Sequence, residues 1–282
     1  MTPQESGRVG GPRALEFVKM HGAGNDYVFV DGIHGVFEPE RGPEVARRLS
    51  DRHRGVGGDG LIVLARSELA DVRMWMWNAD GSRGSMCGNG LRCLAKLAHD
   101  VGVVGGPLVV VETDAGVRRV ELLFEGQTVV GARADMGRIA VDPQPSRVVA
   151  AGHTWELHHV DAGNPHAVVF TDQDPESLPV LEAGAALQQL AGVPGGVNVE
   201  FVRVEGDGGL RQRTFERGSG ETLACGSGAT AAACAAVLLG LVGGPRVEVR
   251  LRGGTLWIEP SDGGAVMEGP ATEVFRGRVE LA

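Results

Sequence analysis

The stretch Leu-Ala-Cys-Gly-Ser-Gly-Ala-Thr-Ala-Ala-Ala (223–233) predicts a helix that opens with a cysteine and two glycines. A second Cys-Gly-x-Gly lies in Ser-Met-Cys-Gly-Asn-Gly-Leu-Arg-Cys (85–93). The distance along the chain from Cys87 to Cys225 is close to half of its length of 282 residues. This spacing indicates an internal duplication. A duplication also predicts that the segments around the two cysteines repeat.

Segments on the N-terminal side of each cysteine repeat in the same order, at nearly the same spacing as the two cysteines. One repeated segment could arise by chance, but several repeated segments in the same order predict a duplicated unit. The repeated segments are an Ala-Gly-Asn loop (23–25 and 162–164), a helix (42–49 and 178–190), an apolar strand (59–64 and 197–202) and an alternating strand (72–78 and 210–216).

Strands outnumber helices in this pattern, and several are separated only by turn-length segments, which favours antiparallel pairing. We therefore expect an α+β fold with two similar domains, and not a doubly wound parallel sheet. The predicted parts are a flexible tail (1–13), an N-terminal domain (14–133) completed by the C-terminal residues (271–282), and a C-terminal domain (134–270).

Composition limits the class of protein. With 43% apolar and 22% charged residues, the chain is typical of a globular protein, and its net charge of −9 argues against a nucleic-acid partner. No apolar run approaches the roughly 20 residues that span a bilayer, and the N-terminus lacks the apolar segment of a signal peptide. We expect a cytoplasmic protein without a membrane partner, whose four cysteines are free thiols.

A cysteine in the first turn of a helix lies beside unpaired backbone N–H groups, which lower its pKa and favour a reactive thiolate. The glycines let an anionic ligand approach the same N–H groups. A lone cysteine is more often an inert core residue. Two at matching helix starts favour a catalytic role for Cys87 and Cys225, whereas Cys93 and Cys234 are expected in the core.

The sequence gives little support for a cofactor or metal site. The small residues at 226, 228 and 231 fit a dinucleotide fingerprint only loosely and lack the required βαβ unit. No histidine or cysteine pair has zinc-site spacing, so no metal is expected. The chain has two lysines, Lys19 and Lys96, and neither suits a Schiff-base cofactor.

Polar residues lie beside the repeated segments and form a candidate cage for a ligand with carboxylate and ammonium groups: Asn25, Asn78, Asn164, Asn198, Glu216 and Arg217. Arg217 can grip a carboxylate with two hydrogen bonds, and Glu216 can accept from an ammonium group. Two thiols at separate helix starts suit a reaction in which one thiol removes a proton from one face of a carbon atom and the other returns a proton to the opposite face.

Several motifs together resemble the diaminopimelate epimerase family from about residue 14 onward: 20–27 (Met-His-Gly-Ala-Gly-Asn-Asp-Tyr), 78–82 (Asn-Ala-Asp-Gly-Ser), 86–93, 163–166 (Gly-Asn-Pro-His), 197–199 (Val-Asn-Val) and 216–228. The resemblance implies cofactor-independent interconversion of LL- and meso-diaminopimelate, for lysine and peptidoglycan-precursor synthesis. It also implies a homodimer, and two pseudo-twofold-related domains, each a mostly antiparallel sheet around a central helix, with the active site in the cleft between them.

Carried over by position, the resemblance makes Cys225 the acceptor of the proton of the LL-substrate and Cys87 the donor. The reacting end would be held by Asn25 and by the backbones of Gly88, Asn89, Gly226 and Ser227. The distal end would be held by Asn78, Asn164, Asn198, Glu216 and Arg217, and His166 and Glu216 would tune the thiols. Two positions depart from the family pattern: Gly60 stands where some members have Gln, and Leu91 where Ala is commoner.

Three alternatives remain open from the sequence. A proline or hydroxyproline racemase would share the chemistry, but such relatives typically carry His where this chain has Asn89. A thiol-redox protein would instead join Cys87 and Cys225 in a regulatory disulfide. A non-catalytic protein that binds diamino acids would use the polar cage alone.

Overall fold

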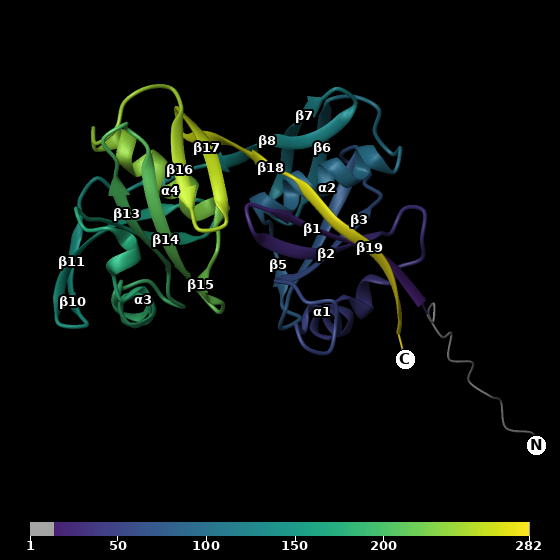
Figure 1. Ribbon diagram of the computed structural model, residues 1–282, viewed down its shortest axis with the longest axis horizontal. Helices are drawn as coiled ribbons and strands as arrows, with labels where there is room; N and C mark the ends of the chain where they lie inside the picture. Colours follow the sequence, from purple (N-terminus) through teal and green to yellow (C-terminus); the bar gives the residue numbers. More distant parts are fainter. Residues whose placement is uncertain (1–13, 282) are drawn as a thin grey trace, which may run out of the picture.

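The computed structural model describes residues 14–281, so the predicted tail (1–13) lies outside the described residues. Figure 1 shows two lobes of strands and helices, with α1 and α2 in one lobe and α3 and α4 in the other. Strands dominate both lobes. The predicted two-domain α+β fold is therefore confirmed, while the domain boundaries remain a prediction.

The N-terminal lobe contains two α-helices, and its elements are β1 (Ala14–Gly22), β2 (Asn25–Asp31), η1 (Pro39–Arg41), α1 (Gly42–Ser50), β3 (Gly60–Ala65), β4 (Val72–Asn78), β5 (Arg83–Gly84), α2 (Gly88–Asp100), β6 (Leu108–Thr113), β7 (Gly116–Glu125) and β8 (Thr128–Arg138). The predicted helix at 42–49 and the strand at 72–78 are present.

The second lobe begins with β9 (Ala140–Val141) and β10 (Ser146–Ala150). From there it follows the same order as the first lobe, with β11 (His153–Asp161), β12 (Pro165–Phe170), η2 (Pro175–Ser177), α3 (Val180–Leu190), β13 (Asn198–Val204), β14 (Leu210–Glu216), β15 (Gly220–Thr222), α4 (Gly226–Leu238), β16 (Val247–Leu251), β17 (Gly254–Ser261) and β18 (Gly264–Pro270). The last strand, β19 (Thr272–Glu280), returns to the N-terminal lobe. Helices α2 and α4 have the same length, 13 residues, and each begins directly after its cysteine.

The sheets are mostly antiparallel, but four pairings are parallel: β2 with β3, β4 with β6, β12 with β13, and β14 with β16. Each of these pairs is separated in the chain by one of the four α-helices. A helical crossover returns the chain to the same end of the sheet and so produces parallel strands. The parallel pairings therefore occur at equivalent places in the two lobes.

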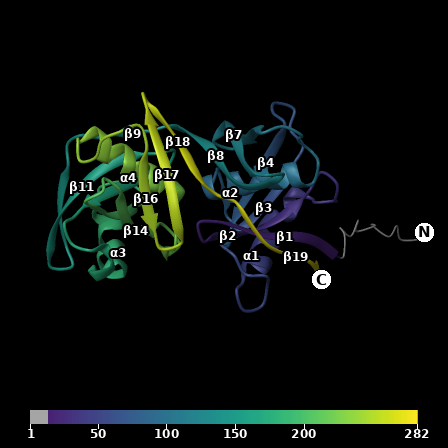
Figure 2. The same cartoon turned by 45° about the horizontal axis from the view of Figure 1, so that its top comes forward.

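Both cysteine-led helices are central to their lobes (Figure 2). In α2, Leu91, Leu94 and Leu97 belong to a core formed with the surrounding strands. In α4, residues 229–236 are all buried and consist mainly of alanine. Small side chains allow backbones to pack closely around the helix, which explains why a helix with so little side-chain volume can still be buried on all sides.

Two strands near the C-terminus connect the lobes. β18 pairs antiparallel with β8, and β19 then continues into the N-terminal lobe and pairs antiparallel with β1 (Figures 1 and 2). The predicted boundary at residue 133 lies inside β8, and the one at residue 270 lies at the end of β18. Among the described helices, none combines the length and apolar character needed to cross a membrane.

Candidate active site

Cys87 and Cys225 are the N-cap residues of α2 and α4. Each has an extended backbone, and each sulfur accepts a hydrogen bond at 3.4 Å from a backbone N–H group in the first turn, that of Gly90 or Gly228. The two thiols thus replace the oxygen side chains that usually satisfy the first N–H groups of a helix. Both cysteines are free.

The first residues of α2 and α4 lie on either side of Met267. A Cβ atom on Gly88 would approach the Met267 Cε atom to 2.5 Å, and one on Gly226 would approach its Sδ atom to 3.1 Å. The Cβ atom added to Gly226 would also lie 3.5 Å from the Asn89 Oδ1 atom. The two helix starts are therefore close neighbours, as expected for twofold-related loops that face one another.

Cys87 contacts β2 and the first turn of α2. Its Sγ atom donates to the Asn25 Oδ1 atom at 3.3 Å, and the Asn89 Nδ2 atom donates to the same oxygen at 3.2 Å. Burial raises the pKa of the Cys87 thiol, although hydrogen bonds from the Gly90 backbone and the Tyr27 hydroxyl act in the opposite direction. Three predicted residues, Cys87, Asn25 and Asn89, are thus brought together.

Cys225 lies near two carboxylates, those of Glu216 and Glu200. Its Sγ atom lies 3.5 Å from the Ser227 hydroxyl. Burial raises the pKa of the Cys225 thiol well above its ordinary value, and the charges of Glu216 and Glu200 raise it further. The lowering of pKa expected at a helix start is therefore outweighed by burial at both cysteines.

A buried pair of His166 and Glu200 lies beneath α4. The His166 Nδ1 atom is 2.9 Å from the Glu200 Oε1 atom, both side chains are fully buried, and the Nε2 atom is 3.0 Å from the Asn164 Oδ1 atom. A Cβ atom on Gly228 would come within 2.5 Å of the same Glu200 oxygen. The pair therefore packs directly against the first turn of the helix that Cys225 caps.

Glu200 and Tyr27 are site residues that the sequence analysis missed. Glu200 is a buried acidic residue within β13, between Val199 and Phe201, and Ile62 occupies the equivalent position of the first repeat. Ile62 packs against Gly90 as Glu200 packs against Gly228. An alignment of the two repeats would have singled out this replacement of an apolar side chain by a charged one.

The other predicted polar residues are distributed around these groups. Burial raises the pKa of Glu216, whose carboxylate accepts from the Thr222 hydroxyl. The Asn198 Oδ1 atom accepts from the backbone N–H group of Arg217 at 2.8 Å, whereas the Arg217 side chain is exposed. The Asn78 Nδ2 atom donates to the Ser82 hydroxyl at 2.9 Å, at the end of β4.

A hollow of about 670 Å³ lies beside this region and is lined by residues of β9, β11, β12 and adjoining loops, including Asn164 and His166. Neither cysteine lines it. Of the residues that the family resemblance assigns to the distal end of a ligand, the hollow thus adjoins Asn164.

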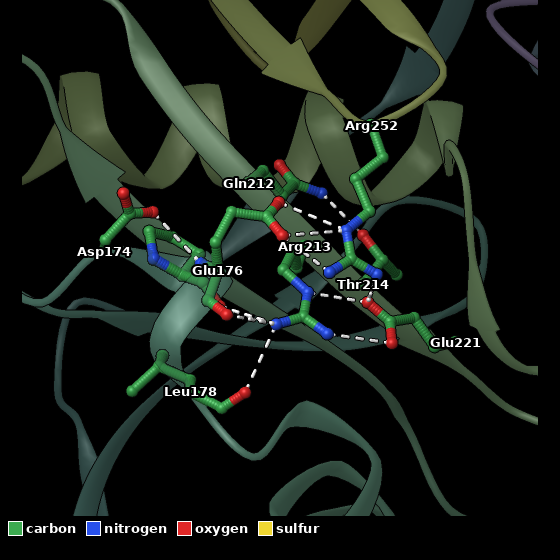
Figure 3. Close-up of polar contacts among 9 residues, drawn as sticks. Asp174, Glu176, Leu178, Gln212, Arg213, Thr214, Glu221 and Arg252 are labelled. Carbon is green, nitrogen blue, oxygen red and sulfur yellow. Dashed lines mark hydrogen bonds and ion pairs between the residues drawn. The ribbon is translucent and has the colours of Figure 1, made fainter.

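The β14–β15 hairpin, which bears Glu216 and leads to Cys225, is held by an ion-pair network (Figure 3). Arg213 donates to both oxygens of Glu221 at 2.6 and 2.9 Å and to the carbonyl oxygen of Leu178 at 3.2 Å. Arg252 joins Glu221 to Glu176. The network fixes the hairpin against the segment around η2.

Side chains that could hold a metal ion or form a Schiff base are few near the two thiols in residues 14–281. In residues 14–281, no cluster of three or more His, Cys, Asp or Glu side chains is arranged to hold a metal ion. Lys19 is paired with Asp26, and Lys96 with Asp100 at 2.9 Å. Both lysines therefore have carboxylate partners outside the cysteine pair.

Solved structures share the two-lobed fold and so define a structural class. The structure resembles a hydroxyproline epimerase from Agrobacterium vitis with a TM-score of 0.77, at 17% identity, over 95% of this chain and 93% of that one. A PhzF-family phenazine biosynthesis protein from Bacillus anthracis gives a TM-score of 0.73, at 13% identity, over 96% of this chain and 100% of that one. At these identities the likeness concerns the fold alone.

Sequence comparison identifies the family within this class. The model of the diaminopimelate epimerase family matches residues 17–141 and 158–274, one segment in each half. The diaminopimelate epimerase of Pelotomaculum thermopropionicum is 42% identical over 93% of this chain and 98% of its own length. That of Methanococcus maripaludis is 38% identical over 95% and 100%. The chain belongs to the diaminopimelate epimerase family.

Proposed function

We propose that this chain is a cofactor-independent epimerase that interconverts LL- and meso-diaminopimelate, in lysine and peptidoglycan-precursor synthesis. The observation that carries the proposal is the pair of thiols, Cys87 and Cys225, which cap equivalent helices in the two lobes. Inversion of a stereocentre needs an acceptor on one face of the carbon and a donor on the other, and a duplicated fold supplies two such arms.

In the proposed reaction, the Cys225 thiolate takes the Cα proton of the LL-substrate and the Cys87 thiol gives a proton to the opposite face. One C–H bond breaks and one forms, and the two sulfurs exchange their protonation states. The return reaction uses the same groups in reverse. Charge that develops on the substrate carboxylate is met by the N–H groups at the starts of α2 and α4, at Gly88, Asn89, Gly226 and Ser227.

The distal ammonium and carboxylate groups of the substrate are assigned to the polar cage. Arg217 suits the carboxylate because its exposed guanidinium can form two parallel hydrogen bonds. Glu216 suits the ammonium group, with Asn78, Asn164 and Asn198 as further partners. His166 and Glu216 would tune Cys225. We further propose a cytoplasmic homodimer, with the domains divided near residues 133 and 270.

Isotope exchange tests the activity directly. When the protein is incubated with diaminopimelate in deuterium oxide, deuterium should enter Cα as the LL- and meso-forms interconvert. Proline and hydroxyproline are the matched control substrates, because a racemase of that kind would label them instead. Failure to label diaminopimelate would contradict the proposed function, as expected for a redox protein or a binding protein.

Removal of either thiol should abolish turnover. We expect Cys87→Ala and Cys225→Ala to lose interconversion of the two stereoisomers while they retain the circular dichroism spectrum and melting temperature of the wild type. Cys93→Ala provides a control because Cys93 is a buried core thiol within α2. Near-normal activity in either of the first two variants would refute the two-thiol scheme.

A further inference from the structure

A chain of hydrogen bonds runs beneath Cys87 and links two charged side chains through two amides. The Arg92 Nη2 atom donates to the Asn89 Oδ1 atom at 2.7 Å, and the Asn89 Nδ2 atom donates to the Asn25 Oδ1 atom at 3.2 Å. The Asn25 Nδ2 atom then donates to the Asp59 Oδ2 atom at 2.7 Å. Neither Arg92 nor Asp59 is among the residues assigned above to the substrate.

The charged ends fix the orientation of both amides. A guanidinium group can only donate, so the oxygen of Asn89 faces Arg92 and its nitrogen faces Asn25. An ionised carboxylate can only accept, so the nitrogen of Asn25 faces Asp59. Arg92 and Asp59, at the two ends of the chain of hydrogen bonds, therefore orient the Asn25 Oδ1 atom towards Cys87. There it accepts a hydrogen bond from the thiol at 3.3 Å.

Asp59 is held as an acceptor by three donors. Its Oδ1 atom accepts from Arg52 at 2.9 Å, and its Oδ2 atom accepts from the Asn25 side chain and, at 3.2 Å, from the backbone N–H group of Asp26. Burial and the neighbouring Asp26 raise the pKa of Asp59, while these three donors stabilise its charged form.

We propose that Asp59 is a positioning residue, whose carboxylate fixes the Asn25 amide with its oxygen towards Cys87 and so keeps Cys87 in the protonated form that donates to the substrate. A bond from the thiol to a carbonyl oxygen exists only while the sulfur carries its proton, whereas a rotated amide would offer N–H groups to a thiolate. This inference rests on the proposed function for the direction of proton transfer.

Other charged or titratable groups also bear on Cys87 and must remain unchanged in a test. The Tyr27 hydroxyl on β2 favours the thiolate, and the Glu216 charge from β14 opposes it. Arg92 and Cys93, both on α2, interact with Cys87 electrostatically. A substitution at Asp59 leaves all four of these side chains in place and alters the partner of the Asn25 amide.

The described residues of the second lobe form no equivalent chain, so Cys225 serves as an internal reference. When the repeats are aligned on their two cysteines, Val197 corresponds to Asp59 and Ser227 corresponds to Asn89. A carboxylate and an amide are thus replaced by an apolar side chain and a hydroxyl. A change that acts through Asn25 should alter Cys87 and leave Cys225 as it was.

The test follows the reaction of each cysteine with iodoacetamide as a function of pH, by mass spectrometry of the separated peptides. In Asp59→Asn, the midpoint for Cys87 should move to lower pH while that for Cys225 stays in place. The kcat/KM for diaminopimelate should fall about tenfold, as expected when one hydrogen bond to a charged group is lost. Asp26→Asn is the charge control, because it removes a neighbouring carboxylate that binds Arg52 and Lys19 but does not bind the Asn25 side chain.

A double-mutant cycle separates positioning from the loss of a negative charge. In an Asn25→Ala background, Asp59→Asn should leave the Cys87 midpoint unchanged, because no amide remains to rotate. An equal shift in both backgrounds, no shift in either, or the same shift in Asp26→Asn would overturn the proposal. Thermal melting of each variant first establishes that it folds. If Asp59→Asn does not fold, Asp59→Ser takes its place. Since the alkylation readout needs no turnover, its outcome is independent of isotope exchange in the wild type.

Discussion

Glu216 and Glu200 place two carboxylates near Cys225, whereas Cys87 lies near neutral amides and a tyrosine hydroxyl. The two thiols of the duplicated site therefore differ in their electrostatic setting, even though both cap equivalent helices. Burial raises the pKa of each, and the acidic neighbours raise that of Cys225 further. A thiol beside carboxylates is the harder of the two to ionise.

Neutralisation of Glu216 should make Cys225 more acidic. Since the Glu216 charge raises the pKa of Cys225, Glu216→Gln should lower that pKa, so that Cys225 is alkylated faster at a fixed pH between neutral and the wild-type midpoint. Cys87 should change less, because Glu216 interacts with Cys225 through a hydrogen bond and its charge, and with Cys87 through its charge alone. Glu182→Gln, at an exposed position on α3, should change neither rate. A slower Cys225 in Glu216→Gln would contradict this account.

At the level of single residues, the sequence predicted which residue types and segments form the site better than it predicted the contacts between them. The thiols, the asparagines and His166 could be singled out because they occur in repeated or recognisable motifs. Glu200 and Tyr27 were missed, because no local motif marks either residue within its strand; for Glu200, only the comparison with Ile62 in the first repeat reveals the unusual charge. Their importance comes from tertiary packing against α4 and beside Cys87, which no local pattern records.

Among the elements, the β14–β15 hairpin depends on the buried Arg213 network. Arg213→Met would remove a donor from Glu221 and from three backbone carbonyl groups, at a site where the Arg213 and Glu221 side chains are only 8% and 13% exposed. We expect urea denaturation to show a loss of about 3 kcal/mol in the free energy of unfolding. The control is Arg147→Met, where the ion pair with Glu156 is 75% and 50% exposed and should contribute less than about 1 kcal/mol.

The first turn of α4 should not tolerate a side chain at Gly228. In Gly228→Ala, the new Cβ atom would lie 2.5 Å from the Glu200 carboxylate and must displace it or the helix. We expect a loss of about 1–3 kcal/mol, together with lower activity because His166 and Cys225 adjoin the same carboxylate. Gly243→Ala, which has open space around the added atom, should melt as the wild type does. Equal melting temperatures for the two variants would show that Glu200 is not held in place.

The elements themselves were largely predictable. The alternation at 72–78 and 210–216 predicted strands with the observed bounds, and both cysteine helices start where the glycines allow. The four parallel pairings were not foreseen, because strand patterning indicates which residues are extended but not which strands become neighbours. Pairing depends on the path of each helical crossover, which is decided by packing over the whole lobe.

At the scale of the whole molecule, β19 makes the N-terminal lobe depend on residues from the far end of the chain. Deletion of residues 272–282 would leave β1 without the partner with which it pairs from Ala14 to His21. An exposed strand edge promotes association between molecules. We expect the truncated protein to melt at a lower temperature and to aggregate in size-exclusion chromatography. A monodisperse truncated protein with the wild-type melting temperature would show that this pairing is dispensable.

The position of β19 also bears on how the protein is made. This strand follows the entire second lobe in the chain, so the first lobe cannot complete its sheet until the second has been synthesised. During translation, β1 therefore waits beside the ribosome with an open edge, at the stage when neighbouring nascent chains are most able to pair with it. Chaperone capture in that interval would protect the first lobe far more than the second.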